Sequence, residues 1–233
     1  MTIATDNLRQ VKGRIAAACV SADRDVDSVT LLAVSKTVPP EAVRAALAAG
    51  QHAFGENYVQ EALDKMSALA DARAQITWHL IGPLQSNKAR AVAEAFDWVH
   101  SIDRFKIAQR LSEHRPAHLP PLQVCLQVNI SGEASKSGLL PADVASVAAA
   151  VAALPRLRLR GLMAIPEPVA DLAAQRAPHR ALRAVLTRLN GLGLAMDTLS
   201  MGMSADLEAA IAEGATLVRV GTAIFGSRPA LSA

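Results

Sequence analysis

Lys36 is the lysine of this sequence whose position best suits covalent chemistry. It directly follows the apolar run LLAVS at 31–35, which is typical of a buried strand. Burial at a strand end disfavours the charged form of an amine and leaves its lone pair ready to attack a carbonyl, as a Schiff base requires. The alternative is a lysine whose charged head extends into solvent. The other lysines lie on expected helices (Lys12, Lys65, Lys88 and Lys106) or in the polar loop SGEASKSG (Lys136).

Small and hydroxylated residues near the end of the chain are typical of a phosphate site. Gly202 and Ser204 follow the strand-like run TLSM, and Gly221 and Thr222 lie in the run RVGT. Backbone N–H groups at the start of a helix bind anions, and we expect Ser204 to be the N-cap of such a helix. In the structural interpretation, Ser204 only caps that helix and Gly221 eases a bend of the backbone. The joint placement of these residues favours a phosphate.

Arg219 lies two residues before Gly221 and is expected on the same face of the last strand. It would therefore point into the protein, where a buried arginine needs a partner. One candidate partner is a carboxylate such as Glu56, at the end of the second expected strand. The other is the nitrogen of a pyridine ring.

Eight short apolar runs alternate with amphipathic, Ala- and Leu-rich segments, which is the pattern of repeated βα units. The expected strands cover 30–35, 52–56, 77–82, 98–102, 122–129, 157–165, 198–201 and 217–226, and an extra helix covers about 5–22. We predict an α/β fold, a single (β/α)₈ TIM-type barrel with an extra N-terminal helix, formed by residues 1–233 as one domain. The pattern alone also permits a doubly wound open sheet. In a barrel, residues that follow the strands meet at the C-terminal mouth, where active sites form.

Composition disfavours several classes of protein. Apolar residues make up 51% of the chain and charged residues 19%, as in a compact globular domain. The net charge of +3 comes from scattered basic residues, and aromatic residues are few, so we expect no nucleic-acid partner. Cys19 and Cys125 lack metal-ligand spacing, so we expect neither a metal site nor a disulfide framework. The Ala-rich stretch 144–154 is too short to span a membrane, and we expect a cytoplasmic protein without a membrane partner.

Several long motifs occur in order and resemble the YggS-type pyridoxal-phosphate homeostasis family over nearly the whole chain. They are AVSKT (33–37), FGENYVQEALDK (54–65), WHLIGPLQSNK (78–88), VNISGEASKSG (128–138), GLMAIP (161–166) and LSMGMSADLEAAIAEGATLVRVGTAIFG (199–226). The resemblance implies a barrel of the alanine-racemase type that carries pyridoxal 5′-phosphate (PLP) as an internal aldimine on Lys36.

The resemblance also assigns the other cofactor contacts. In that family the phosphate contacts match Ser204, Gly221 and Thr222, the contact to the pyridine nitrogen matches Arg219, and Asn57 lies beside the ring. Members commonly carry a basic residue where this chain has Val38 and a histidine where it has Pro83. These departures put extra basic groups at the rim in doubt, but not the lysine linkage. We expect His79 to be a core histidine held by backbone, the alternative being an approach to the cofactor.

The expected function is cofactor supply and amino-acid or keto-acid balance without well-defined turnover. The partners are PLP, amino acids as external aldimines, and PLP-requiring apoenzymes. Enzymes that use the ring as an electron sink usually set a carboxylate against a protonated ring nitrogen. An arginine is always charged and cannot accept that proton, so the ring remains a weaker sink. The alternative is a PLP enzyme of narrow scope, such as a weak racemase or lyase. A nucleotide-binding role for SGEASKSG fails because no glycine directly precedes Lys136, and we interpret this segment as a loop over the barrel mouth.

Overall fold

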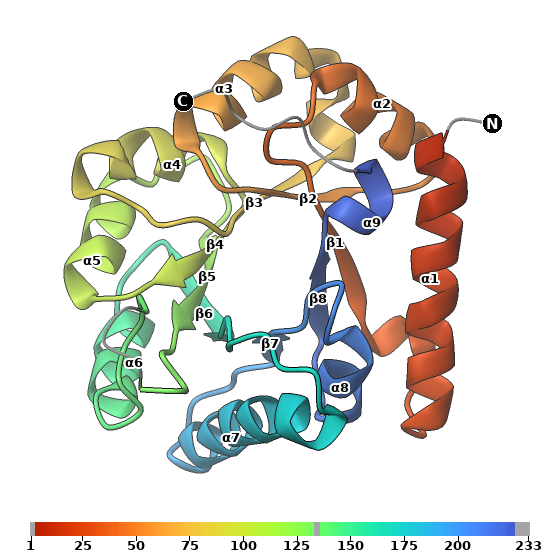
Figure 1. Cartoon of the computed structure of the whole chain (residues 1–233). Helices are drawn as coiled ribbons and strands as arrows, with labels where there is room; N and C mark the ends of the chain where they lie inside the picture. Colours follow the sequence, from red (N-terminus) through yellow and green to blue (C-terminus); the bar gives the residue numbers. More distant parts are fainter. Residues whose placement is uncertain (1–2, 133–135, 227–233) are drawn as a thin grey trace.

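The computed structural model describes residues 3–132 and 136–226, which form a closed barrel of parallel strands (Figure 1). In chain order the strands are β1 (Thr30–Val34), β2 (Ala53–Glu56), β3 (Thr77–Leu80), β4 (Trp98–Ile102), β5 (Leu122–Gln127), β6 (Leu157–Met163), β7 (Thr198–Ser200) and β8 (Leu217–Val220). Each strand pairs with the next, and β8 pairs with β1 in the register Leu32 with Arg219. This last pairing confirms the (β/α)₈ barrel and excludes the open sheet.

Helices surround the barrel (Figure 1). They are α1 (Ile3–Ser21), α2 (Pro40–Ala48), α3 (Val59–Ala68), α4 (Ala89–Ala95), α5 (Phe105–His114), α6 (Val144–Ala152), α7 (Leu172–Gly191), α8 (Leu207–Ala212) and α9 (Thr222–Phe225), with the 3₁₀ turns η1 (Val26–Ser28), η2 (Ala70–Gln75) and η3 (Ser86–Lys88). The extra N-terminal helix is therefore confirmed as α1. It packs against α8 and α9, buries Leu8 and Val11, and donates a hydrogen bond from Asn7 Nδ2 to the carbonyl of Ile224 at 3.0 Å.

The strands form because their apolar residues are covered on both faces, by the barrel interior and by the helices. Their sequences are therefore nearly continuous apolar runs rather than alternating ones. Leu32, Phe54 and Trp78 are fully buried, and every residue of β8 is buried. No helix in the described ranges is long and apolar enough to cross a membrane.

The predicted extent of the last strand, 217–226, is wrong. β8 ends at Val220, and Gly221 is the N-cap of α9. The apolar residues after Thr222 do not extend the sheet, because Ile224 packs into the core as part of the short helix that contacts α1. Residues 133–135, in the expected loop over the barrel mouth, lie outside the described residues.

Candidate functional site

One cavity at the C-terminal mouth of the barrel contains all six residues that the sequence selected. Its volume is about 300 Å³, and it is lined by Val34, Lys36, Asn57, Ile81, Ile165, Met203, Ser204, Ala205, Arg219, Gly221 and Thr222. These residues come from the ends of strands that are far apart in the sequence. The structure therefore brings the expected amine, guanidinium and hydroxyl groups together, which the order of residues along the chain could not show.

Lys36 lies in a turn directly after β1 and is half-buried. The next residue, Thr37, has a φ of 60°, a left-handed conformation that costs energy for a residue with a side chain. Its N–H donates a 2.6 Å hydrogen bond to Oε1 of Glu61, at the start of α3. The Lys36 turn is therefore held in place from the next βα unit.

A buried ionic cluster around Lys65 contacts the residue that precedes Lys36. Lys65 Nζ lies 2.7 Å from the carbonyl oxygen of Ser35, 2.6 Å from Oε1 of Glu56 and 3.1 Å from Oε1 of Glu61. The Ser35 hydroxyl also donates to Oε1 of Glu56, at 2.6 Å. Burial raises the pKa of Glu56, and Lys65 opposes that shift. Lys65 therefore has a structural role, and it fixes the carbonyl group that precedes Lys36.

Asn57 follows β2 and contributes an unsatisfied acceptor to the cavity. Its Oδ1 is buried and has no hydrogen-bond partner in the described structure. The backbone of Gly82 lies directly against Asn57, since a Cβ at position 82 would be 2.2 Å from the Asn57 carbonyl oxygen. A buried acceptor without a partner is costly, so a ligand with a donor group would stabilise this arrangement.

Ser204, Gly221 and Thr222 line the same cavity from the segments that follow β7 and β8. The expectation that Ser204 is a helix N-cap is wrong. Residues 204–206 form a turn, and the N-cap of α8 is Asp206. A turn stands before α8 in place of a helical start at Ser204, because Asp206 Oδ1 accepts a 2.6 Å hydrogen bond from the N–H of Met203.

The negative charge of Asp206 is already engaged by protein groups. Its second oxygen, Oδ2, lies 3.0 Å from Nε2 of His179 in α7. Burial alone would raise the pKa of Asp206, but the hydrogen bonds from His179 and from the Met203 N–H outweigh it and lower that pKa. Gly202, with a φ of 91°, permits the tight approach of this segment, because a Cβ there would lie 2.5 Å from the Cβ of Ala210.

Arg219 points inward from β8 and is 4% exposed. The proposed partner Glu56 is wrong. Arg219 Nη1 donates to the carbonyl oxygen and to Oγ of Ser200, at 2.6 and 2.7 Å, and Nη2 donates to the carbonyl of Ala164 at 2.8 Å. Carbonyl groups at the ends of β6 and β7 take the place of a carboxylate, while Glu56 is occupied by Lys65. Burial lowers the pKa of Arg219 to about 10, which leaves the guanidinium charged at neutral pH.

His79 is a core histidine, as expected, since it is 3% exposed. It is held by another histidine rather than by backbone, and it does not line the mouth cavity. Its Nδ1 lies 2.9 Å from Nε2 of His100, and Nδ1 of His100 lies 2.8 Å from Oγ of Ser200. The sequence analysis missed His100. A signal was present, because His79 and His100 lie on the neighbouring strands β3 and β4, and the register that pairs His79 with Trp98 brings His100 within reach two residues further along β4.

The two departures from the family pattern have different surroundings. Val38 is 7% exposed and packs in the hydrophobic core, so this residue contributes no charge to the rim. Pro83 is exposed and borders an adjoining cavity of about 290 Å³, which also contacts Asn57 and Lys136. Among the described residues, no group of three or more His, Cys, Asp or Glu side chains could hold a metal ion.

Comparisons with known proteins agree in one assignment. The family model of the alanine racemase N-terminal domain matches residues 7–229. The pyridoxal phosphate homeostasis protein of Pseudomonas aeruginosa is 62% identical over 98% of this chain and 97% of its own length. The protein of that name from Escherichia coli (strain K12) is 54% identical over 95% of both.

Solved structures extend the comparison. PipY of Synechococcus elongatus without PLP has 40% identity and a TM-score of 0.86, over 97% of this chain and 100% of its own. PipY with PLP bound has 41% identity and a TM-score of 0.80, over 91% and 100%. Alanine racemase from Corynebacterium glutamicum, at 18% identity and a TM-score of 0.71, shares the fold over 99% of this chain and 62% of its own. With the barrel, the mouth cavity and relatives matching almost end to end, the chain belongs to the pyridoxal phosphate homeostasis protein family.

Proposed function

We propose that this protein holds PLP in the mouth cavity through a Schiff base on Lys36, and that it acts in vitamin B6 homeostasis and amino-acid and keto-acid balance as one domain. The observation that carries this proposal is that Lys36, Arg219 and two hydroxyl groups line the same cavity of about 300 Å³. A family relative, PipY, has been solved with PLP bound. When bound, PLP supplies an aldehyde that condenses with amines and a ring that delocalises charge.

The cavity residues suit the three parts of this cofactor. The hydroxyls of Ser204 and Thr222 can donate to a phosphate, together with N–H groups at the start of α9 that have no intrahelical acceptor. Arg219 can donate to a ring nitrogen while its other donors keep their bonds to Ser200 and Ala164. Asn57 Oδ1, a buried acceptor without a partner in the described structure, can accept from a ring substituent.

The same lining favours a carrier over an efficient enzyme. Of the described residues that line the cavity, Lys36 and Arg219 are the only ionisable ones. Arg219 remains charged and cannot serve as a base, and a ring nitrogen that accepts its hydrogen bond stays unprotonated. Racemisation needs a second acid or base on the far face of the substrate. Tyr58 is 51% exposed and does not line the cavity.

The cellular setting belongs to the same proposal. We infer a cytoplasmic protein that gives PLP to apoenzymes and exchanges it with amino acids. Cys19 and Cys125 are free and buried, which suits a reducing compartment. Amino acids need only reach the Lys36 amine, which lies in a half-buried position at the mouth.

Borohydride reduction of the purified protein, followed by peptide mapping, tests the proposal. We expect the reduced cofactor on the peptide that contains Lys36. Lys36→Ala should remove the visible absorption band of lysine-bound PLP. Thermal unfolding of the PLP-free protein should be nearly unchanged, because Lys36 contributes little to the core. Lys88→Ala, at an exposed lysine, is the control and should keep the band. A band that survives in Lys36→Ala would show that another lysine carries the cofactor.

A further inference from the structure

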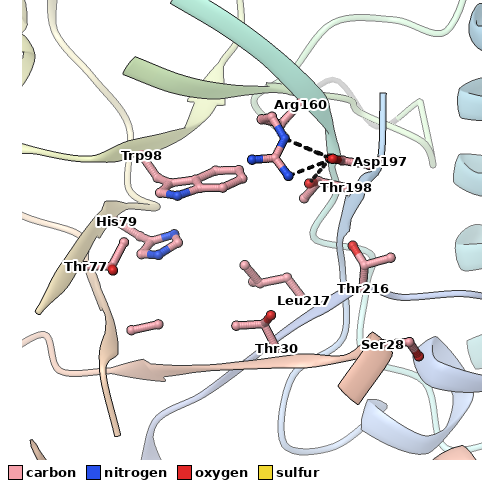
Figure 2. A pocket seen from close by; sticks show the side chains of 11 residues that line it. Ser28, Thr30, Thr77, His79, Trp98, Arg160, Asp197, Thr198, Thr216 and Leu217 are labelled. Carbon is pink, nitrogen blue, oxygen red and sulfur yellow. Dashed lines mark hydrogen bonds and ion pairs between the residues drawn. The ribbon is translucent and has the colours of Figure 1, made fainter. Parts of the chain in front are cut away.

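A second cavity lies at the opposite, N-terminal end of the barrel and has no lining residue in common with the mouth cavity. Its volume is about 420 Å³. Figure 2 shows its lining side chains, most of which come from the first residues of the strands or from the segments just before them. They are Ser28, Thr30, Ala53, Thr77, His79, Trp98, Arg160, Asp197, Thr198, Thr216 and Leu217. Nothing in the proposed handling of PLP uses this cavity.

The wall formed by Trp98 is packed by neighbouring side chains, and its charges are balanced. The guanidinium of Arg160 lies 4.9 Å from the centre of the Trp98 ring and makes a 2.7 Å ion pair with Asp197. On the other side of the indole, His79 stacks at 5.3 Å with an angle of 12° between the rings (Figure 2). Arg160 also donates from Nη1 to Gln123 at 3.0 Å. The two charged side chains of this lining therefore neutralise each other, and neither is available as an unpaired partner for an ionic ligand.

His79 presents an unused ring nitrogen to this cavity. The residue is 3% exposed, and its Nδ1 is bonded to His100. Its Nε2 has no partner among the described residues and is not one of the fully buried side-chain atoms that lack one, so this atom is open to the cavity. A residue that is almost entirely buried thus directs one polar atom into an otherwise neutral pocket.

The hydrogen bonds that start at Arg219 determine that His79 Nε2 is a donor. An arginine only donates, so Ser200 Oγ must accept from Arg219. The hydroxyl hydrogen of Ser200 then has one acceptor in the described structure, which is Nδ1 of His100. His100 in turn donates from Nε2 to Nδ1 of His79, and a neutral His79 carries its hydrogen on Nε2. Burial supports the neutral forms, because it lowers the pKa of His79 to about 3 and that of His100 well below its ordinary value.

Two hydroxyl groups accompany this N–H. Thr77 precedes His79 by two residues on β3 and so lies on the same face of the strand. Thr30, the first residue of β1, also lines the cavity (Figure 2). Neither hydroxyl has a partner in the described structure. Uncharged donors and acceptors of this kind suit a ligand with carbonyl or hydroxyl oxygens, and an anion would meet Asp197 without an unpaired cation to offset it.

We propose that the N-terminal cavity is a second binding site, which takes a small uncharged molecule whose carbonyl or hydroxyl oxygen accepts a hydrogen bond from His79 Nε2. The chain His79, His100, Ser200 and Arg219 connects this site to the mouth of the barrel. An acceptor at His79 strengthens donation along the chain, because hydrogen bonds in series polarise one another. Binding of a ligand in the N-terminal cavity therefore changes the hydrogen bonds of Arg219. By linkage, a ligand at Arg219 changes the affinity of the N-terminal cavity to the same extent. The proposal stands whether or not PLP binds at the mouth.

Nitrogen-15 NMR of the full-length protein with acetamide as the probe tests this site. We expect His79 and His100 to carry hydrogen on Nε2 and not on Nδ1. Acetamide should shift the His79 Nε2–H signal saturably, and the Arg219 guanidinium signals should follow with the same dissociation constant. Acetate, which has the same shape and a negative charge, should bind more weakly.

Two variants complete the test. His79→Phe keeps a ring against Trp98 but removes the N–H, and it should weaken acetamide binding by roughly two- to tenfold and abolish the response of Arg219. Thr77→Val removes one of the accompanying hydroxyl groups and leaves the chain from His79 to Arg219 intact. It is the second variant should His79→Phe fail to fold, and it should weaken acetamide binding while Arg219 still responds. His118→Phe, at an exposed histidine, is the control. A hydrogen on Nδ1 of His79, no saturable shift, equal binding by His79→Phe, or tighter binding of acetate would each overturn the proposal.

Discussion

Replacement of Lys65 by methionine should destabilise the protein more than almost any other single lysine change. Lys65 is 3% exposed and donates to Ser35, Glu56 and Glu61, and the side chain of Glu56 is fully buried. Methionine keeps most of the volume but leaves the Glu56 charge without its cation. Removal of one partner of a buried ion pair costs about 3–5 kcal/mol of unfolding free energy. Because Glu61 is partly exposed, we expect the lower end of that range, about 3 kcal/mol.

The pH dependence of this loss identifies its cause. The folded pKa of Glu56 is already raised, and the loss of Lys65 raises it further. A carboxyl group with a raised folded pKa binds more protons folded than unfolded, so its contribution to stability falls as the pH rises above the ordinary Glu value. The difference between Lys65→Met and the wild type should therefore be larger at about pH 8 than at about pH 5.

Urea unfolding at the two pH values measures both effects. Lys106→Met, at an exposed lysine of α5, is the matched control and should change stability by less than about 0.5 kcal/mol. Addition of Glu56→Gln to Lys65→Met should recover part of the loss, because the charge without a partner is gone. A loss below about 1 kcal/mol, or one that is the same at both pH values, would refute the view that Lys65 neutralises a buried charge beneath the Lys36 turn.

Two further predictions concern the mouth cavity. Ser204→Ala and Thr222→Val should each raise the dissociation constant for PLP by about tenfold in equilibrium dialysis, since each removes a hydrogen bond to a charged phosphate, and Ser146→Ala is the control. Unchanged constants in both would place the phosphate elsewhere. Amino acids added in deuterated water should shift the absorption spectrum of the PLP-loaded protein without appreciable deuterium at Cα. Exchange at an ordinary enzyme rate of about 1–10³ per second would instead establish a narrow-scope PLP enzyme.

The parts of the fold that were predictable depend on local patterns. Each strand was located because a short apolar run between turn residues is visible in the sequence itself. Lys36 and Gly221 were placed at one mouth because parallel strands of a barrel all end at the same face. The N-terminal helix was expected at about 5–22, ahead of the first strand. None of these inferences required knowledge of contacts between distant residues.

The parts that failed depend on such contacts. The end of β8 is set by the packing of Ile224 against α1, more than 200 residues away in the chain. Ser204 is not an N-cap because Asp206 closes the preceding turn. The partners of Arg219 are carbonyl groups, which every residue possesses, so no side-chain pattern could identify them. A carboxylate was the reasonable expectation only if side chains alone were considered.

Closure of the barrel is the step that creates the mouth cavity proposed to hold PLP. β1 and β8 are far apart in sequence, yet their register, Ala33 with Val220, places the Lys36 turn beside Gly221. A slip of one residue would turn Arg219 away from the interior and move Gly221 relative to Lys36, because side chains alternate along a strand. The amine and the phosphate-side residues are thus correctly spaced only in the closed barrel. A ligand that contacts both binds the native state alone, and it stabilises closure by mass action. Retention of the proposed cofactor and closure of the first strand against the last are therefore linked equilibria, so substitutions along the β1–β8 seam should weaken both together.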